Sequence, residues 1–475
     1  METTQELEKI AQQLDPSHEQ RSIILKKAMD YANYFLNRLS ELPGYDGHTS
    51  FEKLSSMGIE EKGKSIEAIL EMLKTEVDVA GINSASGRHL GFIPGGGLWA
   101  SSIADMLGDI SNKYAGIAFS GPGQVKIESQ VIRWMAGIIG YPSTAFGNLT
   151  SGGSIANLIA VKAARDFHAI NSTNVKKAAI YFGDQTHHSV YKALNITGLH
   201  EAVLRKIPVD EHFRIDTTQL QTQIKKDKAS GLTPFLVIAS AGTTDTGAID
   251  PLNEIADICT EYKAWFHVDA AYGGFFMLLD EMKDKLKGIE RSDSLVLDPH
   301  KTLFLPFGSG AVVLRDRNIL LSSNSSKASY LSDTEGMDDI NPADTGIELT
   351  RPNRGLRMWL PLQLHGVAPF KACLQEKLLL SNYFYEQIGK MGFETGPQPD
   401  LTVSIFRYPN DEYNHINQQL IDAIHEDGRV FLSSTIIKGK LWLRCAVVAH
   451  RTHQKEIELA LQVIKENLGK MKFSS

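Results

Sequence analysis

The chain has 475 residues, of which 42% are hydrophobic and 22% charged, as is typical of a globular protein with two or three domains. The net charge of −7 argues against nucleic-acid and anionic-membrane partners, because both need a basic surface. The sequence has no apolar run of about 18 residues and no secretory signal pattern, and its three cysteines are widely spaced, so we expect a cytoplasmic protein with free thiols and no membrane association.

Two amphipathic helices are expected before the main domain. Ser17 and Gln20 form the pattern of a capping box, after which apolar residues recur at helical spacing from Ile24 to Leu39. A second helical pattern runs over residues 66–77. These helices cannot bury both of their faces against each other. We therefore predict that residues 1–85 form a helical segment that clasps a second subunit.

From about residue 86 to residue 318, short apolar segments alternate with helical patterns. This alternation predicts an α/β domain, residues 86–350, with a mostly parallel sheet. Ligand sites in such sheets lie at the carboxyl ends of the strands. The expected strands are Ala178–Phe182, Phe235–Ala239, Trp265–Val268, Ser294–Leu297 and Ala311–Leu314, and the expected helices include Ile155–His168 and Leu252–Tyr262.

Residues 322–346 are polar, rich in Ser and Asp, and without apolar periodicity. A loop of this length is uncommon in a compact domain and is usually functional or disordered, so we expect a mobile loop here. The remaining sequence predicts a small α+β domain, residues 351–475. Its expected elements are a helical region over Leu356–Leu380, strands Thr402–Phe406, Val430–Ile437 and Leu441–Val448, and helices at about 413–427 and 453–468.

Lys301 and Asp269 are the two candidate catalytic residues that these patterns favour most. Lys301 lies between the apolar segments Leu295–Leu297 and Leu303–Leu305, so burial is expected although most lysines are solvated. Asp269 ends an apolar strand, and the alternative to a functional role is a turn or cap aspartate. A buried amine and a carboxylate are what pyridoxal phosphate requires: the amine forms a Schiff base, and the carboxylate pairs with the protonated pyridine nitrogen.

A phosphate site is predicted at Thr150–Ser154, a glycine-containing turn that runs into the helical residues 155–158. Backbone N–H groups at a helix N-terminus attract anions, and Ser154 adds a hydroxyl. A simple capping motif is the alternative.

Two further candidates follow other predicted strands. His187, with His188 as the second choice, can stack on an aromatic cofactor ring, and Thr244 can reach the same ring. A structural histidine is the alternative. The predicted cation, anion, phosphate turn and stacking ring all fall at carboxyl ends of strands, as expected of one active site.

The chain resembles the group II pyridoxal-phosphate-dependent amino acid decarboxylases, which act on aromatic amino acids, histidine or glutamate. The resemblance covers about residues 60–465 and is carried by His267–Tyr272, Asp298–Lys301, Thr150–Asn157 and Asp184–Val190. It implies a fold-type-I architecture similar to aspartate aminotransferase and a homodimer with shared active sites. It also implies conversion of an L-amino acid, preferably aromatic, into the amine and CO2.

Other readings stay open. They are other pyridoxal chemistry (aldehyde-forming oxidative deamination, a carbon–carbon lyase or an aminotransferase), an acidic or small substrate, and a regulatory homologue without turnover.

The resemblance also assigns roles to residues. Lys301 matches the Schiff-base lysine, Asp269 the partner of the pyridine nitrogen, and His187 the stacked histidine. Asp298 stands where aromatic decarboxylases often have asparagine. Further cofactor contacts fall, by the same resemblance, on Gly153, Ser154, Ser189, Thr244 and His300.

Residues on the substrate side are implied in the same way. Tyr330 matches a loop tyrosine that protonates the carbanion after CO2 leaves, for which a tyrosine in a disordered loop is the alternative. Arg351 and Arg354 match arginines that support the site, with surface or structural ion pairs as the alternative. The predicted substrate-side residues are Phe92, Ile93, Pro94 and Tyr114.

Overall fold

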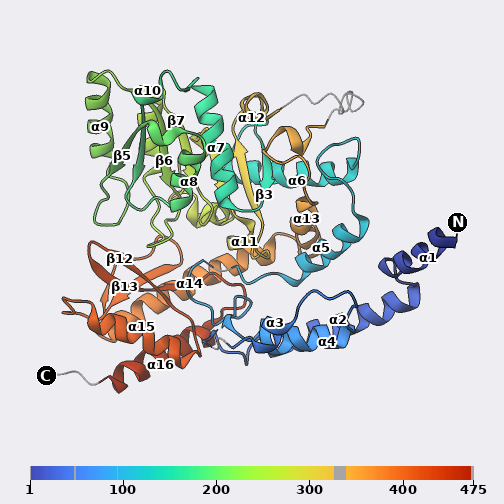
Figure 1. Cartoon of the computed structure of the whole chain (residues 1–475). Coiled ribbons are helices and arrows are strands. Elements are labelled where there is room, and N and C mark those ends of the chain that lie inside the picture. Colours follow the sequence, from blue (N-terminus) through green and yellow to red (C-terminus); the bar gives the residue numbers. More distant parts are fainter. Residues whose placement is uncertain (1, 48–49, 94, 326–338, 472–475) are drawn as a thin grey trace.

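Figure 1 shows a computed structural model, which describes residues 2–47, 50–93, 95–325 and 339–471. Within these residues a seven-stranded sheet has the order β3-β9-β8-β7-β6-β4-β5. The β9 strand is antiparallel to both of its neighbours, and the pairs from β8 to β5 are parallel. The strands are β3 Phe146–Thr150, β4 Ala178–Gly183, β5 Val203–Ile207, β6 Thr233–Ser240, β7 Trp265–Asp269, β8 Ser294–Leu297 and β9 Gly310–Leu314.

Both faces of this sheet are covered by helices. Alternate residues of β6 point to opposite sides, so Val237 and Ala239 join one apolar core while Leu236 and Ile238 join another. This burial on both faces explains why the central strands are continuous apolar runs. The covering helices are α6 Pro122–Ile139, α7 Gly153–Phe167, α8 His188–Ile196, α9 Thr217–Ala229, α10 Leu252–Tyr262 and α12 Arg317–Asn324.

The small C-terminal sheet has the order β10-β11-β13-β12 and is antiparallel. Its apolar face packs with α14, α15 and α16 around a separate core. The predicted helical region over Leu356–Leu380 is two helices, because Gly366 ends the first with a φ of +68°. The elements are α13 Arg354–His365, α14 Ala368–Lys390, β10 Glu394–Thr395, β11 Val403–Arg407, α15 His415–Asp427, β12 Ser433–Ile437, β13 Lys440–Ala446 and α16 Gln454–Lys470.

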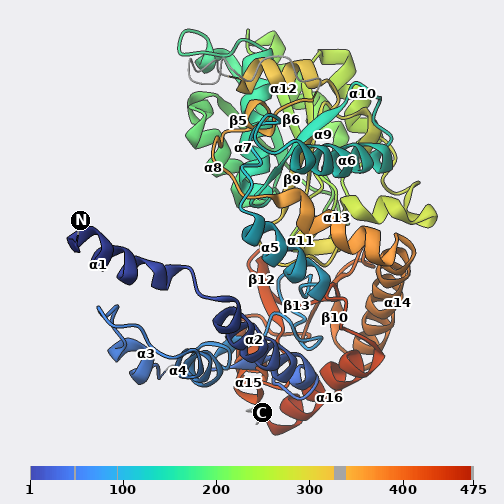
Figure 2. The same cartoon turned by 90° about the vertical axis from the view of Figure 1, so that its right-hand side faces the viewer.

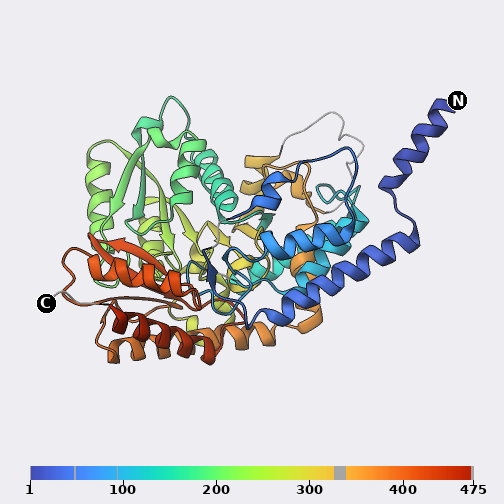
Figure 3. The ribbon, with the colours of Figure 1, turned by 60° about the horizontal axis from the view of Figure 1, so that its bottom comes forward.

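The α1 helix projects from the rest of the molecule, as Figures 2 and 3 show, whereas α2 lies beside α4. The predicted capping box of Ser17 and Gln20 begins α2, a 21-residue helix without a buried residue. No helix of the described chain is long and apolar enough to cross a membrane. The elements of this part are α1 Glu2–Ala11, α2 His18–Arg38, β1 Tyr45–Asp46, α3 Glu52–Ser56, α4 Ile66–Met72, β2 Gly81–Ile82 and α5 Trp99–Ser111.

The polar loop predicted over residues 322–346 is partly wrong at its start, since α12 continues to Asn324. A short 3-10 helix, Pro342–Asp344, lies near its end. Tyr330 and the other residues from 326 to 338 lie outside the described residues, and so does Pro94. The predicted domain limits at residues 85 and 350 stay predictions.

Candidate active site

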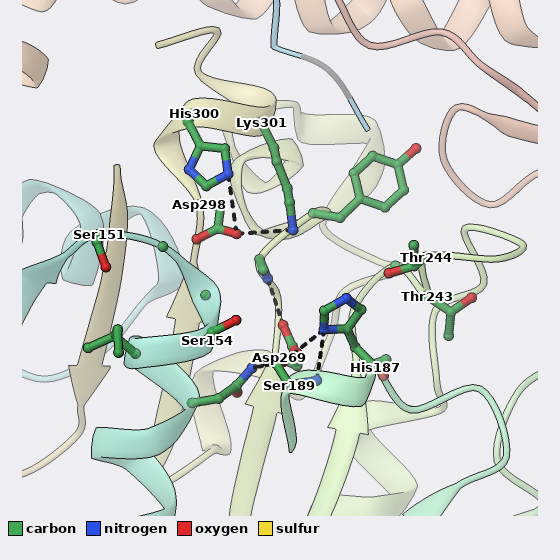
Figure 4. Close-up of a pocket in the computed structure, with 18 of the residues that line it drawn as sticks. Ser151, Ser154, His187, Ser189, Thr243, Thr244, Asp269, Asp298, His300 and Lys301 are labelled. Atoms are coloured by element: carbon green, nitrogen blue, oxygen red, sulfur yellow. Dashed lines mark hydrogen bonds and ion pairs between the residues drawn. The ribbon is translucent and has the colours of Figure 1, made fainter. Parts of the chain in front are cut away.

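A cavity of about 440 Å³ opens where β3, β4, β6, β7 and β8 reach their carboxyl ends (Figure 4). This size lies in the range of small-molecule sites. Several residues that the sequence places at these strand ends therefore line one cavity. The lining residues are Ser151–Ile155, Asn157, Gln185, His187, Ser189, Ser240, Gly242–Thr244, Asp269, Ala271, Tyr272, Asp298, His300 and Lys301.

Lys301 lies in α11, the short helix Pro299–Thr302 that follows β8. Its Nζ is 3.0 Å from Oδ2 of Asp298, and Figure 4 shows the two side chains meeting at one side of the cavity. Asp298 is only 2% exposed. Its second oxygen, Oδ1, has no hydrogen-bond partner among the described residues. The lysine amine is therefore held by a buried carboxylate whose own hydrogen bonding is incomplete.

Asp269 ends β7, the strand next to β8, and is almost fully buried. The backbone N–H of Ala271 donates to Oδ1 at 3.1 Å, and Nδ2 of Asn157 donates to Oδ2 at 2.9 Å. Both carboxyl oxygens of Asp269 are therefore hydrogen-bonded where this residue lines the cavity.

A series of buried hydrogen bonds leads to Asp269 between α7 and the face of the sheet that this helix covers. The indole of Trp265 can only donate, so it donates to Oγ of Ser294, which lies 2.8 Å away. The Ser294 hydroxyl in turn lies 2.8 Å from Nδ1 of His267, and Nε2 of His267 lies 2.8 Å from Oδ1 of Asn157. Since Asn157 uses its Nδ2 to donate to Asp269, its oxygen must accept from His267.

This order makes His267 a neutral imidazole with its proton on Nε2. Burial lowers the pKa of His267 to about 4, which agrees with that state, although the nearby Asp269 acts in the opposite direction. These hydrogen bonds therefore fix the orientation of the Asn157 amide without adding a charge next to the cavity.

His187 caps the N-terminus of α8, and its Nδ1 accepts a hydrogen bond from the backbone N–H of Ser189. The hydroxyl of Ser189 lies 2.8 Å from the same nitrogen and also accepts from Asn157. Burial lowers the pKa of His187, while Asp269 opposes that shift. The ring is thus neutral, carries its proton on Nε2, and lies beside Asp269 in Figure 4.

The predicted phosphate turn forms the opposite side of the cavity and leads into α7 at Gly153. A Cβ at Gly153 would lie 3.0 Å from Oδ2 of Asp298, so a larger residue would push on that carboxylate. The first-turn N–H groups of a helix lack intrahelical acceptors and attract anions. The donors of this turn, the lysine amine and the buried Asp269 together fit a pyridoxal phosphate molecule, whereas no metal-binding cluster occurs among the described residues.

The predicted supporting and substrate-side residues that are described do not line this cavity. Arg351 forms a buried ion pair with Glu128 at 2.8 Å, and both Arg351 and Arg354 donate to the carbonyl oxygen of Leu149, just before the phosphate turn. Arg354 also pairs with Glu348 at 2.6 Å.

The described substrate-side residues lie outside the cavity in different surroundings. Phe92 is 54% exposed with a φ of +52°, and its ring packs against Phe431. Ile93 is buried, and the Tyr114 hydroxyl donates to the carbonyl of Leu349 at 2.8 Å.

The sequence interpretation missed Asn157, His267 and Gln185, and it gave Asp298 no role as the partner of Lys301. A signal for His267 was present, because residues i and i+2 of a strand share a face. His267 therefore lies on the same side of β7 as Asp269. Asn157 could be placed only once α7 was known to lie over that face.

Comparisons with known proteins show the family to which the chain is related. The conserved domain of pyridoxal-dependent decarboxylases matches residues 50–408. An aromatic-L-amino-acid decarboxylase of Bacillus atrophaeus is 34% identical over 96% of this chain and 97% of its own length. Tyrosine decarboxylase 2 of Arabidopsis thaliana is 30% identical over 78% of this chain and 72% of its own length.

Among solved structures, that of Oryza sativa TDC with PLP and tryptamine superimposes with a TM-score of 0.90 at 23% identity, over 96% of this chain and 99% of that chain. The shared architecture confirms the predicted fold.

Proposed function

Because this chain belongs to the pyridoxal-dependent decarboxylase family, we propose that it converts an aromatic L-amino acid into the corresponding amine and CO2. The chain is a carboxy-lyase that depends on pyridoxal 5'-phosphate. The observation that carries the proposal is the placement of Lys301 and Asp269 after adjacent parallel strands, in one cavity with the N-terminal turn of α7. The aromatic preference rests on the bacterial relative, which matches nearly the whole chain.

The bound cofactor supplies an electron sink for the electron pair that the departing carboxylate leaves behind. We assign its retention to the chain's own groups. Lys301 holds it covalently, and Asp269 stabilises the positive charge on its ring nitrogen. His187 stacks on the ring, and the remaining proposed contacts are Gly153, Ser154, Ser189, Thr244 and His300.

Orientation is the second task of the site. Side chains around a cavity decide which bond of the amino acid is broken, because they fix its direction before any chemistry occurs. We assign this task, on the resemblance alone, to the predicted substrate-side residues Phe92, Ile93, Pro94 and Tyr114, of which the described ones do not line the cavity of this single chain. Arg351 and Arg354 support the site indirectly. Both donate to the carbonyl oxygen of Leu149, the residue that precedes the phosphate turn.

Proton return to Cα is assigned to Tyr330, on the resemblance alone, since that residue is not described. A tyrosine hydroxyl can donate a proton to a carbanion, whereas phenylalanine cannot. Retention of tyrosine at this position favours plain decarboxylation over formation of an aldehyde.

A homodimer in the cytoplasm is the proposed assembly and location. Large apolar side chains are exposed on the N-terminal helices, including Ile23 and Ile24 of α2 and Leu7 of α1, and α5 exposes Trp99 and Ile110. Single exposed apolar residues are ordinary, but a 21-residue helix without a buried residue needs a surface to pack on. A second copy supplies that surface. The cysteines Cys259, Cys373 and Cys445 are free, as expected of a reducing compartment.

The decisive experiment is a substrate panel of aromatic, acidic, basic and sulfur-containing L-amino acids, with amine, CO2, aldehyde and peroxide measured separately. We expect equal amounts of amine and CO2 from at least one aromatic amino acid, and none from the Lys301→Ala variant. Aldehyde and peroxide as the main products would replace decarboxylation with oxidative deamination. Activity confined to acidic or basic amino acids would contradict the aromatic assignment.

A further inference from the structure

We propose that Arg357 of α13 is a positioning residue that holds the His300 ring beside the phosphate turn. It acts through the turn of residues 306–309, whose Ser309 carbonyl accepts a hydrogen bond from that ring. This inference rests on the proposed function, in which His300 contacts the cofactor. Arg357 itself does not line the cavity, so it acts only through the residues that it orients.

The His300 ring has one nitrogen that is bound by the protein and one that faces the cavity. Its Nδ1 lies within hydrogen-bond distance of the Ser309 carbonyl oxygen, which can only accept, so Nδ1 carries a proton. Its Nε2 lies 3.8 Å from Oδ2 of Asp298, on the cavity side of the ring in Figure 4. Nε2 is therefore the nitrogen that is available to a ligand.

The same ring borders the phosphate turn. A Cβ added to Gly152 would lie 3.6 Å from Cε1 of His300, the carbon between the two ring nitrogens. Burial lowers the pKa of His300, and the nearby Asp298 carboxylate opposes that shift. An anion at the phosphate turn acts in the same direction as Asp298, because it favours a ring that donates from both nitrogens. The direction in which Nε2 points therefore decides how well the ring can bind that anion.

The turn that provides the Ser309 carbonyl has an exposed tip, so burial alone does not fix it. Phe307 is 63% exposed, and Gly308 has a φ of +92°, a conformation that favours glycine. Arg357 anchors this tip, since its Nη1 donates to the carbonyl oxygen of Phe307 at 2.9 Å and to Oγ of Ser309 at 3.3 Å. A Cβ at Gly308 would lie only 3.2 Å from the same nitrogen, so the guanidinium and the turn are in close contact.

Asp105 of α5 fixes the guanidinium from the other side. Its Oδ1 accepts from Nε of Arg357 at 2.8 Å, which leaves Nη1 to reach the turn. A guanidinium presents its N–H donors in a rigid plane, so one ion pair sets the direction of the remaining donors. A lysine could pair with Asp105 or with the turn, but it could not hold both in a fixed geometry.

The alternative role for Arg357 is an ion pair that only joins α5 to α13. The side chains of Arg357 and Asp105 are 23% and 27% exposed, and ion pairs so near the surface usually add little stability. A purely structural pair also gives no reason for the hydrogen bonds of Nη1 to the turn. The two roles differ in whether the effect of Arg357 on the cofactor depends on His300.

A double-mutant cycle on cofactor binding tests this dependence. The apoproteins of the wild type, Arg357→Gln, His300→Ala and the double variant are titrated with pyridoxal phosphate and followed by visible absorbance. We expect Arg357→Gln to weaken binding about tenfold, the equivalent of one hydrogen bond. In the His300→Ala background the same change should have no further effect, because the ring that Arg357 positions is absent.

Pyridoxal without its phosphate provides the second readout. Because His300 borders the phosphate turn, Arg357→Gln should leave the affinity for pyridoxal unchanged. A general loosening of the fold would weaken binding of both ligands alike. Arg357→Lys keeps one charge, so it should lose less affinity for pyridoxal phosphate than Arg357→Gln. It replaces the glutamine variant in the cycle if that variant does not fold.

Arg291→Gln is the matched control. Arg291 also pairs with an aspartate, Asp257, at 2.7 Å and donates to a backbone carbonyl, that of Asn253. It precedes β8, however, and so lies at the opposite end of this strand from α11. This variant should bind pyridoxal phosphate as the wild type does.

An unchanged affinity in Arg357→Gln, an equal loss with and without the His300 ring, or an equal loss for pyridoxal would each overturn the inference while the proposed function stands. A wild-type protein that binds no pyridoxal phosphate would overturn both.

Discussion

The carboxylate of Asp269 is supported by Asn157, which also lines the cavity, and through Asn157 by the buried His267. Asn157 donates to it, and His267 fixes the orientation of the Asn157 amide. Asn157 donates its amide N–H groups to Asp269 and to the Ser189 hydroxyl, so its surroundings fix the orientation of the amide. Buried networks of this kind are effective only when every member is satisfied. Removal of one member of the network should therefore weaken binding of the cofactor.

Replacement of Asn157 by alanine should weaken binding of pyridoxal phosphate. The change removes a charge-assisted hydrogen bond worth about 1.5–3 kcal/mol, so the dissociation constant should rise roughly ten- to hundredfold. Titration of the apoprotein followed by visible absorbance measures it. Asn195→Ala, on the exposed side of α8, is the control. Unchanged affinity in Asn157→Ala would remove the chain of hydrogen bonds from our account of the site.

His89 provides a test of how a buried side chain without a hydrogen-bond partner affects the stability of the fold. Both of its ring nitrogens lack hydrogen-bond partners among the described residues, and its ring packs edge-on against Phe431. Burial lowers the pKa of His89 to about 4, from 6.5. The folded protein therefore binds fewer protons than the unfolded chain between these values, and its stability falls as the pH drops through that window.

His89→Phe should flatten this acid dependence. The wild type should lose up to about 1.4 kcal/mol per pH unit through this group, and the variant should keep that stability. Denaturant unfolding at pH 7, 6 and 5 gives both slopes. An equal loss of stability in the two proteins would show that His89 is not held neutral, and His200→Phe, at an exposed position, controls for the added ring.

At the scale of elements, apolar strands were predictable and polar ones were not. The strands β4, β6, β7, β8 and β9 were found because both faces are buried, which leaves apolar runs of four or more residues. The edge strand β5 contains Arg205 and Lys206 and is only partly buried, so its pattern is that of a surface segment. The β3 strand was not predicted. It contains Gly147, where a Cβ would lie 2.1 Å from the carbonyl oxygen of Val312, and the need for glycine at this close approach is apparent only in the folded sheet.

The residues of the candidate site also divide into those that the sequence could predict and those that it could not. Asp269, at the end of β7, and Lys301, shortly after β8, were predictable from the rule that ligands bind at carboxyl ends of strands. Asn157 was not, because its role depends on how α7 lies over β7. Phe92 and Tyr114 do not line the cavity of this single chain, and no sequence pattern shows where they lie relative to it.

The exposed apolar side chains of α2 predict how the proposed dimer is held together. Ile24→Glu should shift the protein towards the monomer, because it places a charge on a face that we expect to be buried against the second subunit. Asn33→Glu adds the same charge nine residues later, on the opposite side of a helix that turns about 100° per residue, and should leave the dimer intact. Sedimentation at micromolar concentration compares them, and dimers of equal stability would contradict the clasp.

Across the whole molecule, the cavity and the small sheet are tied together by Tyr272. This tyrosine lines the cavity, and its hydroxyl pairs with Oγ of Thr402 at 2.6 Å and accepts from the Thr402 N–H at 2.9 Å. Burial raises the pKa of Tyr272 to about 12, so the hydroxyl stays protonated. A second tie is the ion pair of Arg214 with Asp400 at 2.6 Å.

Tyr272→Phe should lower the free energy of unfolding by about 1–3 kcal/mol, because it leaves the buried Thr402 N–H without its acceptor. Cofactor should still bind, since the aromatic ring remains. Denaturant unfolding with and without pyridoxal phosphate measures the two effects separately. A loss of cofactor at unchanged stability would instead assign the hydroxyl to the cavity. Tyr191→Phe, at a partly buried position of α8, is a suitable control.

The identity of the lysine that carries the cofactor tests the central claim most directly. The loaded protein is reduced with borohydride, which makes the link permanent, and is then digested and mapped by mass spectrometry. We predict a pyridoxyl group on Lys301 and on no other lysine, and its disappearance after removal of the cofactor before reduction. A pyridoxyl group on a different lysine, or none on a protein that retains its visible absorbance, would contradict this assignment of the active site.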